Sequence, residues 1–386
     1  MSLFLFAKQI VDMLYQYQIL DYIMVLSVGV MLCYQIVLVH SSPKNLVKMD
    51  YLVLALAGFS VIAFLKTPAA YETFFKVLSA YLIYFVGRVY WERIEECHSA
   101  VVASSYIVIW ANLLHRIIRY KGLFGGMDNS GEFYYFKTDL TFAMLLGISF
   151  IMIWGRDRIL KWITFIFVVP YMTLYSLSRN GWAMLIPVYF IVLLYLREKK
   201  TGIPLHFSRK LVMAIFMTVL LTFLLAVSFY AVVFLGSGGI TLENFQKNLV
   251  QTRGLLHTRG DIWPLLINDL NSAPLIHRLF GMGWGMDGIL LQEEMVREAH
   301  SLYFKLLYCT GYLGFLCFGI FELSLLFVMK GTKNRALFYL ILAVHFLFLG
   351  YGIGYSSIAS TQMSWFAFLL AGMMVSCRIA QDKGEI

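Results

Sequence analysis

Charged side chains are scarce in this chain of 386 residues. Asp, Glu, Lys and Arg make up 14% of it, against roughly 25% in soluble globular domains. Hydrophobic residues make up 60%, and the mean hydropathy is +0.74. A soluble protein this apolar lacks the polar groups to cover its surface. The composition therefore excludes a cytosolic enzyme, a disordered protein and a disulfide-rich secreted module, and it favours a polytopic membrane protein.

Cysteine is rare as well, with five residues and no CxxC pair among them. Zinc sites and disulfide frameworks need closely spaced or numerous cysteines, so we expect neither. The first fourteen residues are apolar but lack a basic leader and a small-residue cleavage site, so we expect no cleavable signal peptide.

The formal net charge is +9, but no basic run with interleaved aromatic residues lies outside the apolar segments. The charge therefore gives no support to a nucleic-acid partner. In a membrane protein, basic residues more often record the orientation of the chain. We expect membrane lipids around this protein and no nucleic acid.

Apolar runs predict an all-α, polytopic membrane protein with about eleven or twelve transmembrane helices. The expected spans are 17–40, 50–66, 70–88, 98–118, 138–155, 159–177, 180–197, 210–235, 301–329, 335–352 and 358–377. Residues 1–16 carry Lys8 and Asp12 among apolar residues. They form either a short first span or an interfacial amphipathic helix, and we favour the second. Lys76 stands four residues after Glu72, a spacing that predicts an ion pair on one helix face.

The loops between these spans alternate in their content of Lys and Arg. The richer set, with its flanking span ends, holds 17 of the 31 basic residues, and it comprises 41–49, 89–97, 156–158, 198–209, 330–334 and the tail after 377. The positive-inside rule places this set in the cytoplasm. The chain then divides into an N-terminal transmembrane bundle (1–235), a large periplasmic loop with short amphipathic helices (236–300) and C-terminal transmembrane helices (301–386).

Arg179 is a candidate functional residue because it stands in SLSRNGW between two apolar spans. A charge at such depth is costly and marks a functional site by default. The alternative is an arginine that caps the preceding helix and reaches lipid headgroups. Arg116 and Arg119 form a basic end on the fourth span, where they either contact an anionic substrate or merely anchor the span.

The large loop holds further candidates, Arg253, Arg259 and Gly283. Arginine presents a planar set of N–H donors that suits phosphate oxygens, and it stays protonated. The alternative for Arg253 and for Arg259 is a solvent-exposed basic helix face. Gly283 belongs to a GxGxG stretch that either contacts substrate or makes an ordinary turn.

His300 precedes the apolar run 301–329, whose 29 residues would extend roughly 44 Å, more than the hydrocarbon core of about 30 Å. We therefore expect His300 at a helix N-terminus near the membrane surface. Such a position disfavours imidazolium and allows a neutral histidine to act as a general base. A histidine that caps the helix or contacts headgroups is the alternative.

Four short motifs resemble one known family. They are SLSRNGW at 176–182, TRGDIW at 258–263, FGMGWG at 280–285, and His300-Ser301 followed after nine residues by Gly311 and then Gly314. Their order, their spacing and the single large loop resemble the O-antigen polymerase and O-antigen ligase superfamily of bacterial envelope glycosyltransferases. The motifs cover about 35 residues, and the similar architecture extends along the whole chain.

The resemblance implies a GT-C-like fold in the bacterial inner membrane and an active site that faces the periplasm. It implies transfer of a glycan from undecaprenyl pyrophosphate to an acceptor hydroxyl without a nucleotide sugar, a metal or another cofactor. Arg179 and Arg259 match the family arginines thought to hold the pyrophosphate, and His300 matches the histidine implicated in acceptor activation. Arg253 matches no motif. A chain-length regulator protein is a further partner that the resemblance makes conceivable.

The sequence leaves three functions open. A polymerase that joins lipid-linked repeat units is our first choice, and a ligase that delivers finished glycan to lipid A–core is the close alternative. A flippase or transporter for lipid-linked sugars is the alternative from another class. Against it, the chain shows no internal repeat and no pair of Gly/Pro-broken spans.

Overall fold

The computed structural model describes residues 1–14, 17–34, 46–122, 132–134, 136–156, 159–176, 178–202, 259–291 and 299–384, and for residues 18, 93, 94, 179 and 259–261 it describes the backbone alone. All regular structure within these ranges is helical. The expected span 210–235, Arg253 and most of the large loop lie outside the described residues.

Seven helices in the described part of the chain are long and apolar enough to cross a membrane. They are α3 (Lys48–Lys66), α5 (Ile94–Tyr120), α6 (Lys137–Trp154), α9 (Arg179–Thr201), α15 (Leu302–Lys330), α16 (Arg335–Gly352) and α17 (Thr361–Asp382). Two further apolar stretches, Ile19–Cys33 and Ile159–Tyr175, are shorter. The chain is thus a helical protein of multi-pass character.

Ten of the eleven expected spans coincide with helical segments. The remaining helices of the bundle are α1 (Ser2–Met13), α2 (Gln18–Cys33), α4 (Tyr71–Tyr90), and α7 (Ile159–Ile163) with α8 (Val169–Tyr175), which a single π-helical turn joins. Three shorter helices, α12 (Arg259–Ser272), α13 (Leu275–Phe280) and α14 (Met286–Leu290), follow before α15. The total of eleven or twelve transmembrane helices stays a prediction.

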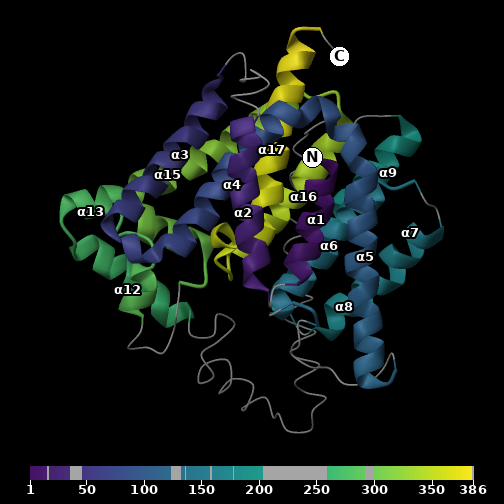
Figure 1. Cartoon of the computed structure of the whole chain (residues 1–386), viewed down its shortest axis with the longest axis horizontal. Helices are drawn as coiled ribbons and strands as arrows, with labels where there is room; N and C mark the ends of the chain where they lie inside the picture. Colours follow the sequence, from purple (N-terminus) through teal and green to yellow (C-terminus); the bar gives the residue numbers. More distant parts are fainter. Residues whose placement is uncertain are drawn as a thin grey trace.

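Helix α17 runs through the middle of the bundle, with α4 packed along it (Figure 1). Two glycines explain how close the helices come. A Cβ atom at Gly87 would lie 2.1 Å from the carbonyl oxygen of Leu369, and one at Gly372 would lie 2.0 Å from that of Tyr84. Small residues let helix backbones approach closely in a membrane, where apolar burial alone does not drive association.

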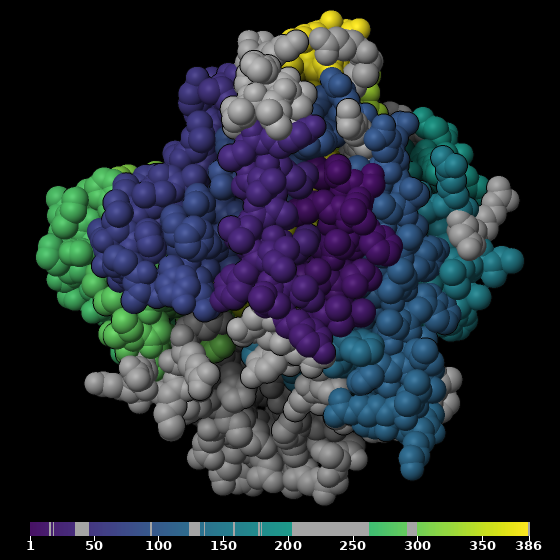
Figure 2. Space-filling view, in the orientation of Figure 1, coloured from purple at the N-terminus to yellow at the C-terminus, as the bar shows by residue number. Residues whose placement is uncertain are grey.

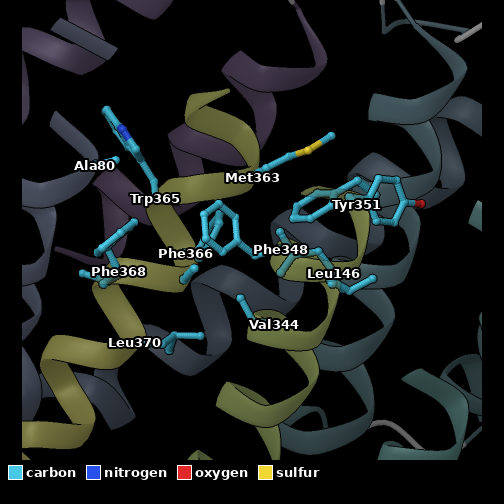
Figure 3. Packing of buried hydrophobic residues seen from close by; sticks show 14 of the residues in the cluster. Ala80, Leu146, Val344, Phe348, Tyr351, Met363, Trp365, Phe366, Phe368 and Leu370 are labelled. Atoms are coloured by element: carbon cyan, nitrogen blue, oxygen red, sulfur yellow. The ribbon is translucent and has the colours of Figure 1, made fainter. Parts of the chain in front are cut away.

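The core lies where α17 meets α4, α6 and α16 (Figure 3). Phe348 and Tyr351 of α16 and Phe366 and Phe368 of α17 are almost fully buried there. The ring of Phe348 meets that of Phe368 edge-on, with centroids 6.1 Å apart, a geometry that aromatic quadrupoles favour. This packing holds α16 against α17.

Helices α1 and α2 lie side by side on one face of the molecule (Figure 2). Twelve residues of α1 extend only about 18 Å, too short to cross a membrane. An interfacial helix would turn its polar side chains to water, but Lys8 and Gln9 are buried and Asp12 contacts Lys8. The polar face of α1 therefore points into the bundle, against α5 and α17.

Described helix ends that flank several of the basic loops lie at one end of the bundle. Arg88, at the end of α4, makes two 2.9 Å contacts to the carboxylate of Asp50 at the start of α3 and donates to Ser376 of α17. Glu198 of α9 binds Arg335 at the start of α16, with contacts of 2.5 and 3.0 Å. Polar contacts at this pole thus join α4 to α3 and α17, and α9 to α16.

Candidate functional site

His300 lies just before α15 and holds an unusual backbone conformation. Its φ angle is +48°, in the left-handed region that few residues other than glycine adopt. Its side chain is partly exposed. Strain of this kind persists only where the surroundings enforce it, and it concentrates at functional sites.

A buried ion pair holds this turn in place. The carboxylate of Asp287, which is 1% exposed, accepts a hydrogen bond of 3.0 Å from the backbone N–H of Ala299. The ammonium of Lys305, one turn into α15, lies 3.5 Å from the same carboxylate. On the other side of His300, Ser301 donates to the carbonyl oxygen of Gly352 at 3.2 Å. The hydrogen bonds of the two neighbouring residues, Ala299 and Ser301, therefore fix the backbone conformation of His300.

Helix α12 brings the Arg259 segment to this turn. The indole N–H of Trp263 donates to the carbonyl oxygen of Ala299 at 3.1 Å, and its ring stacks on Phe304 with centroids 4.6 Å apart. Arg259 precedes Trp263 by four residues, so the two stand on one helix face. The side chain of Arg259 lies outside the described residues. Its backbone begins α12 one turn before Trp263, the residue that contacts Ala299 beside His300.

The SLSRNGW segment reaches the same turn through a chain of hydroxyl contacts. Ser178 caps the start of α9 by accepting a hydrogen bond from the N–H of Gly181, and its Oγ lies 3.1 Å from Oγ1 of Thr141. Thr141 accepts a 2.8 Å hydrogen bond from Tyr351, which directly precedes the Gly352 that binds Ser301.

The glycine and tryptophan of this segment also have structural roles. A Cβ atom at Gly181 would lie 2.7 Å from Thr141, so only glycine lets α9 start this close to α6. Trp182 donates to the carbonyl oxygen of Thr173 in α8. Arg179 is the first residue of α9; its side chain lies outside the described residues.

Three helix starts therefore gather at one end of the bundle: those of α9, α12 and α15, which carry Arg179, Arg259 and His300 at or beside their first residues. Free N–H groups and the helix dipole make each such end favourable to negative charge. Each start therefore suits an anionic group, and the contact of Trp263 with Ala299 joins the starts of α12 and α15 directly. Within the described part of the chain, no cluster of His, Cys, Asp and Glu suits a metal ion.

The two arginines of α5 differ from each other. Arg116 is 1% exposed, binds Glu132 at 3.0 Å, and lies over the rings of Tyr120 and Tyr175. Glu132 also contacts His115 at 2.7 Å. Arg116 thus holds residues 132–134 against the end of α8, while Arg119 is exposed and lies over Tyr120. Their predicted contact with substrate stays a prediction.

The glycine-rich stretch packs against two helices. Gly283 has a φ of +113°, and a Cβ atom there would lie 2.7 Å from Thr67 at the end of α3. A Cβ atom at Gly281 would lie 2.1 Å from the carbonyl oxygen of Cys309 in α15. Gly311 breaks the helical geometry of α15 at this contact, with φ of +74°. The structure thus gives these glycines a packing role that fixes α12–α14 beside His300.

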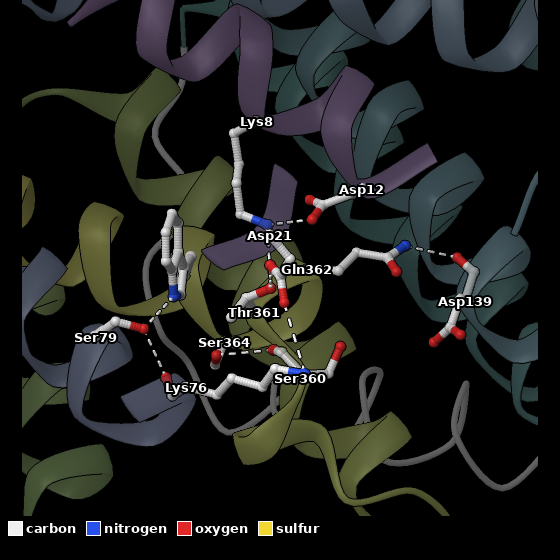
Figure 4. A network of polar contacts seen from close by, with 11 residues as sticks. Lys8, Asp12, Asp21, Lys76, Ser79, Asp139, Ser360, Thr361, Gln362 and Ser364 are labelled. Atoms are coloured by element: carbon white, nitrogen blue, oxygen red, sulfur yellow. Dashed lines mark hydrogen bonds and ion pairs between the residues drawn. The ribbon is translucent and has the colours of Figure 1, made fainter. Parts of the chain in front are cut away.

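One polar feature was absent from the sequence prediction. A cavity of about 140 Å³ opens near the starts of α6 and α17, and its lining includes three carboxylates (Figure 4). Lys8 contacts Asp12 and lies 3.3 Å from the hydroxyl of Thr361, which donates to Asp21 at 2.9 Å. Lys76 lies 3.6 Å from Asp21, so the predicted pairing of Lys76 with Glu72 is wrong. A spacing of four residues within a helix permits an ion pair, but Lys76 instead pairs with Asp21 on the neighbouring helix α2.

Burial raises the pKa of Asp12 to about 6, and the neighbouring ammonium of Lys8 opposes that shift without cancelling it. The cavity adjoins the start of α6, where Gln362 donates to the carbonyl oxygen of Asp139 at 2.8 Å. Asp139 precedes Thr141, the residue that contacts Ser178, by two positions. The sequence shows each of these polar residues but not their convergence, since they come from α1, α2, α4, α6 and α17.

Comparison with known proteins adds no relative: no family model matches this chain, and no curated protein matches it.

Proposed function

We propose that this protein is a GT-C-like glycosyltransferase that polymerises lipid-linked repeat units of O-antigen or a related surface polysaccharide. The donor is a glycan on undecaprenyl pyrophosphate, and the acceptor is a hydroxyl of a second lipid-linked unit. The observation that carries the proposal is the convergence of three helix starts bearing Arg179, Arg259 and His300. These residues are 41 or more positions apart in sequence and belong to the motifs that resemble the polymerase and ligase superfamily.

The chemistry of transfer suits this arrangement. As the anomeric carbon–oxygen bond breaks, negative charge grows on the pyrophosphate, and fixed cations and helix N-termini stabilise that charge. Arg179 and Arg259 are the residues we assign to this role, without a metal ion. The acceptor hydroxyl loses a proton as it attacks, and His300 is the group we assign as its base.

Direct displacement inverts the anomeric centre. NMR of the product linkage tests this step: an inverted configuration is expected, and retention would exclude direct attack by the acceptor.

The proposed orientation places the three helix starts on the periplasmic side of the inner membrane. Its support is the positive-inside rule applied to the opposite pole, where Arg88, Arg335 and Arg378 stand with the basic loops. A lipid-linked donor delivered to the periplasm would then meet the site at the membrane surface.

The ligase remains the second candidate because the motifs are shared and the two enzymes differ in the acceptor. Purified protein given undecaprenyl-pyrophosphate repeat units alone separates them: a polymerase forms a ladder, whereas a ligase forms product only when lipid A–core is added. Gene deletion gives an independent answer, since a lost polymerase leaves core with one repeat unit and a lost ligase leaves bare core. Vesicles in which labelled lipid crosses the bilayer while no glycan grows would instead favour the transporter.

A further inference from the structure

The cavity beside the candidate site is lined mainly by groups that form hydrogen bonds. Carboxylates, hydroxyls and an amide surround it, among them those of Asp12, Asp21, Asp139, Ser356, Thr361 and Gln362. Its volume of about 140 Å³ is below the roughly 300–1,000 Å³ of pockets for drug-sized ligands. It therefore suits a ligand fragment of one ring and not a whole oligosaccharide.

The charges of the cavity disfavour an anion and a metal ion. Asp12 and Asp21 already have ammonium partners, Lys8 and Lys76. Three carboxylates repel phosphate, while the two ammonium groups repel a metal cation. A neutral ligand rich in hydroxyls can donate to the carboxylate oxygens and accept from the hydroxyls and the amide of Gln362 without adding charge.

One group in the cavity lacks a partner. Ser356 is 3% exposed, lines the cavity, and its Oγ forms no hydrogen bond with any residue that the structure describes. A buried hydroxyl without a partner is costly, and such groups in native structures call for an explanation. The adjacent Ser357, by contrast, donates to the carbonyl oxygen of Phe348 at 3.2 Å.

The cavity shares its walls with the candidate site. Asp139 opens the helix that contacts Ser178, beside Arg179. Tyr355 and Ser356 follow within four residues of Gly352, which binds Ser301 beside His300. The cavity is therefore built on the same segments of α6 and of the α16–α17 connection that contact Ser178 and Ser301.

We propose that this cavity is a saccharide subsite, which holds one neutral sugar ring of the lipid-linked acceptor through Ser356, Gln362 and the carboxylates of Asp12 and Asp21. This assignment rests on the proposed glycosyltransferase function for the identity of the acceptor. Its ligand chemistry rests on the cavity alone.

Two neighbouring serines and one alanine provide the test. Wild-type protein in lipid nanodiscs is titrated with glucose, galactose and N-acetylglucosamine, and binding is measured by saturation-transfer NMR. Ser356→Ala should raise the Kd of the bound sugar about threefold to tenfold, the effect of one lost hydrogen bond, with no loss of thermal stability. Ala359→Trp, which fills the cavity, should abolish the transfer. Ser357→Ala is the matched control: it removes an internal hydrogen bond and should lower Tm while leaving Kd unchanged.

Three results would overturn the assignment: no saturation transfer in the wild type, equal transfer in wild type and Ala359→Trp, or displacement of the sugar by inorganic pyrophosphate or sodium alone. Elongation assays keep the two proposals apart. A wild type that binds sugar but builds no polymer removes the polymerase and keeps the subsite. A wild type that elongates, with an acceptor KM that Ser356→Ala does not change, removes the subsite and keeps the polymerase.

Discussion

His300 combines strain with accessibility at the level of a single residue. Its neighbours are fixed by Asp287 and Gly352, so the turn is enforced from outside the residue itself. The left-handed conformation costs a residue other than glycine about 1–2 kcal/mol. Glycine would adopt this backbone conformation with less strain. The presence of histidine there indicates that its imidazole has a functional role.

His300→Gly separates the side chain from the backbone. The relief of left-handed strain roughly offsets the extra unfolded-state entropy of glycine, so Tm should stay within a few degrees of the wild type. Elongation should fall at least about 100-fold, the lower range for loss of a general base. The check is an initial rate beside a thermal melt in the same detergent. Activity that survives in a folded His300→Gly protein would remove the proposed base.

The buried pair Asp50–Arg88 should contribute strongly to stability because neither group reaches water. Their side chains are 0% and 4% exposed, and Tyr84 also donates to Asp50 at 2.8 Å. Asp50→Ala leaves the guanidinium buried without its partner, and we expect a loss of about 3–5 kcal/mol. Chemical unfolding in detergent measures it.

The matched control is Asp382→Ala, which breaks the exposed pair with Arg378 and should cost no more than about 1 kcal/mol. Equal losses in the two variants would mean that burial does not set the strength of these pairs.

At the scale of the elements, the glycines of α4 and α17 determine how closely the central helices pack. Gly372→Ala places a methyl group where the carbonyl oxygen of Tyr84 lies, so the helices must separate. We expect a loss of about 1–3 kcal/mol or more in unfolding experiments. Gly58→Ala in α3, where a Cβ atom meets nothing within 4 Å, should instead stabilise its helix by about 1 kcal/mol. The account of the α4–α17 contact fails if both substitutions are equally tolerated.

The helices themselves were largely predictable, and their inward faces were not. The apolar run 335–352 predicts α16 with the same first and last residues, because apolar length alone defines such a segment. Helix α1 shows what the sequence pattern could not predict. Its polar residues suggest a surface, but Thr361 and Ser105, which contact Lys8 and Gln9, stand far away in the sequence. No local pattern predicts those contacts.

The candidate site shows the same division. Motifs singled out Arg179, Arg259 and His300, and Trp263 belongs to the TRGDIW motif. The structure links these backbone segments through Trp263 and also through Thr141 and Tyr351, which no motif had marked. The glycine-rich stretch with Gly281 and Gly283 left substrate contact and an ordinary turn open, and Cβ atoms at these positions would meet Cys309 and Thr67. Backbone packing leaves the same glycine signature in a sequence as ligand binding does.

At the scale of the whole molecule, the bundle has two unlike poles. One carries the basic helix ends around Arg88, Arg335 and Arg378, and the other carries the cavity and the three helix starts. The orientation follows if the basic pole faces the cytoplasm.

Single cysteines test this orientation. In a Cys33→Ser background, which removes the exposed native thiol, Lys121→Cys reports on the pole of the cavity and Lys333→Cys on the basic pole. A membrane-impermeant maleimide added to cells with a permeabilised outer membrane should label position 121 and spare position 333 until the inner membrane is broken. The reverse pattern would place the candidate site in the cytoplasm, away from a periplasmic donor.

The central claim is that the three helix starts form one glycosyl-transfer site. The most direct measurement is elongation by purified protein supplied with undecaprenyl-pyrophosphate repeat units alone, in wild type and in Arg179→Ala, Arg259→Ala and His300→Ala. We predict a ladder of products with the wild type and its loss in each folded variant. A wild-type ladder that persists undiminished in all three variants would contradict the claim.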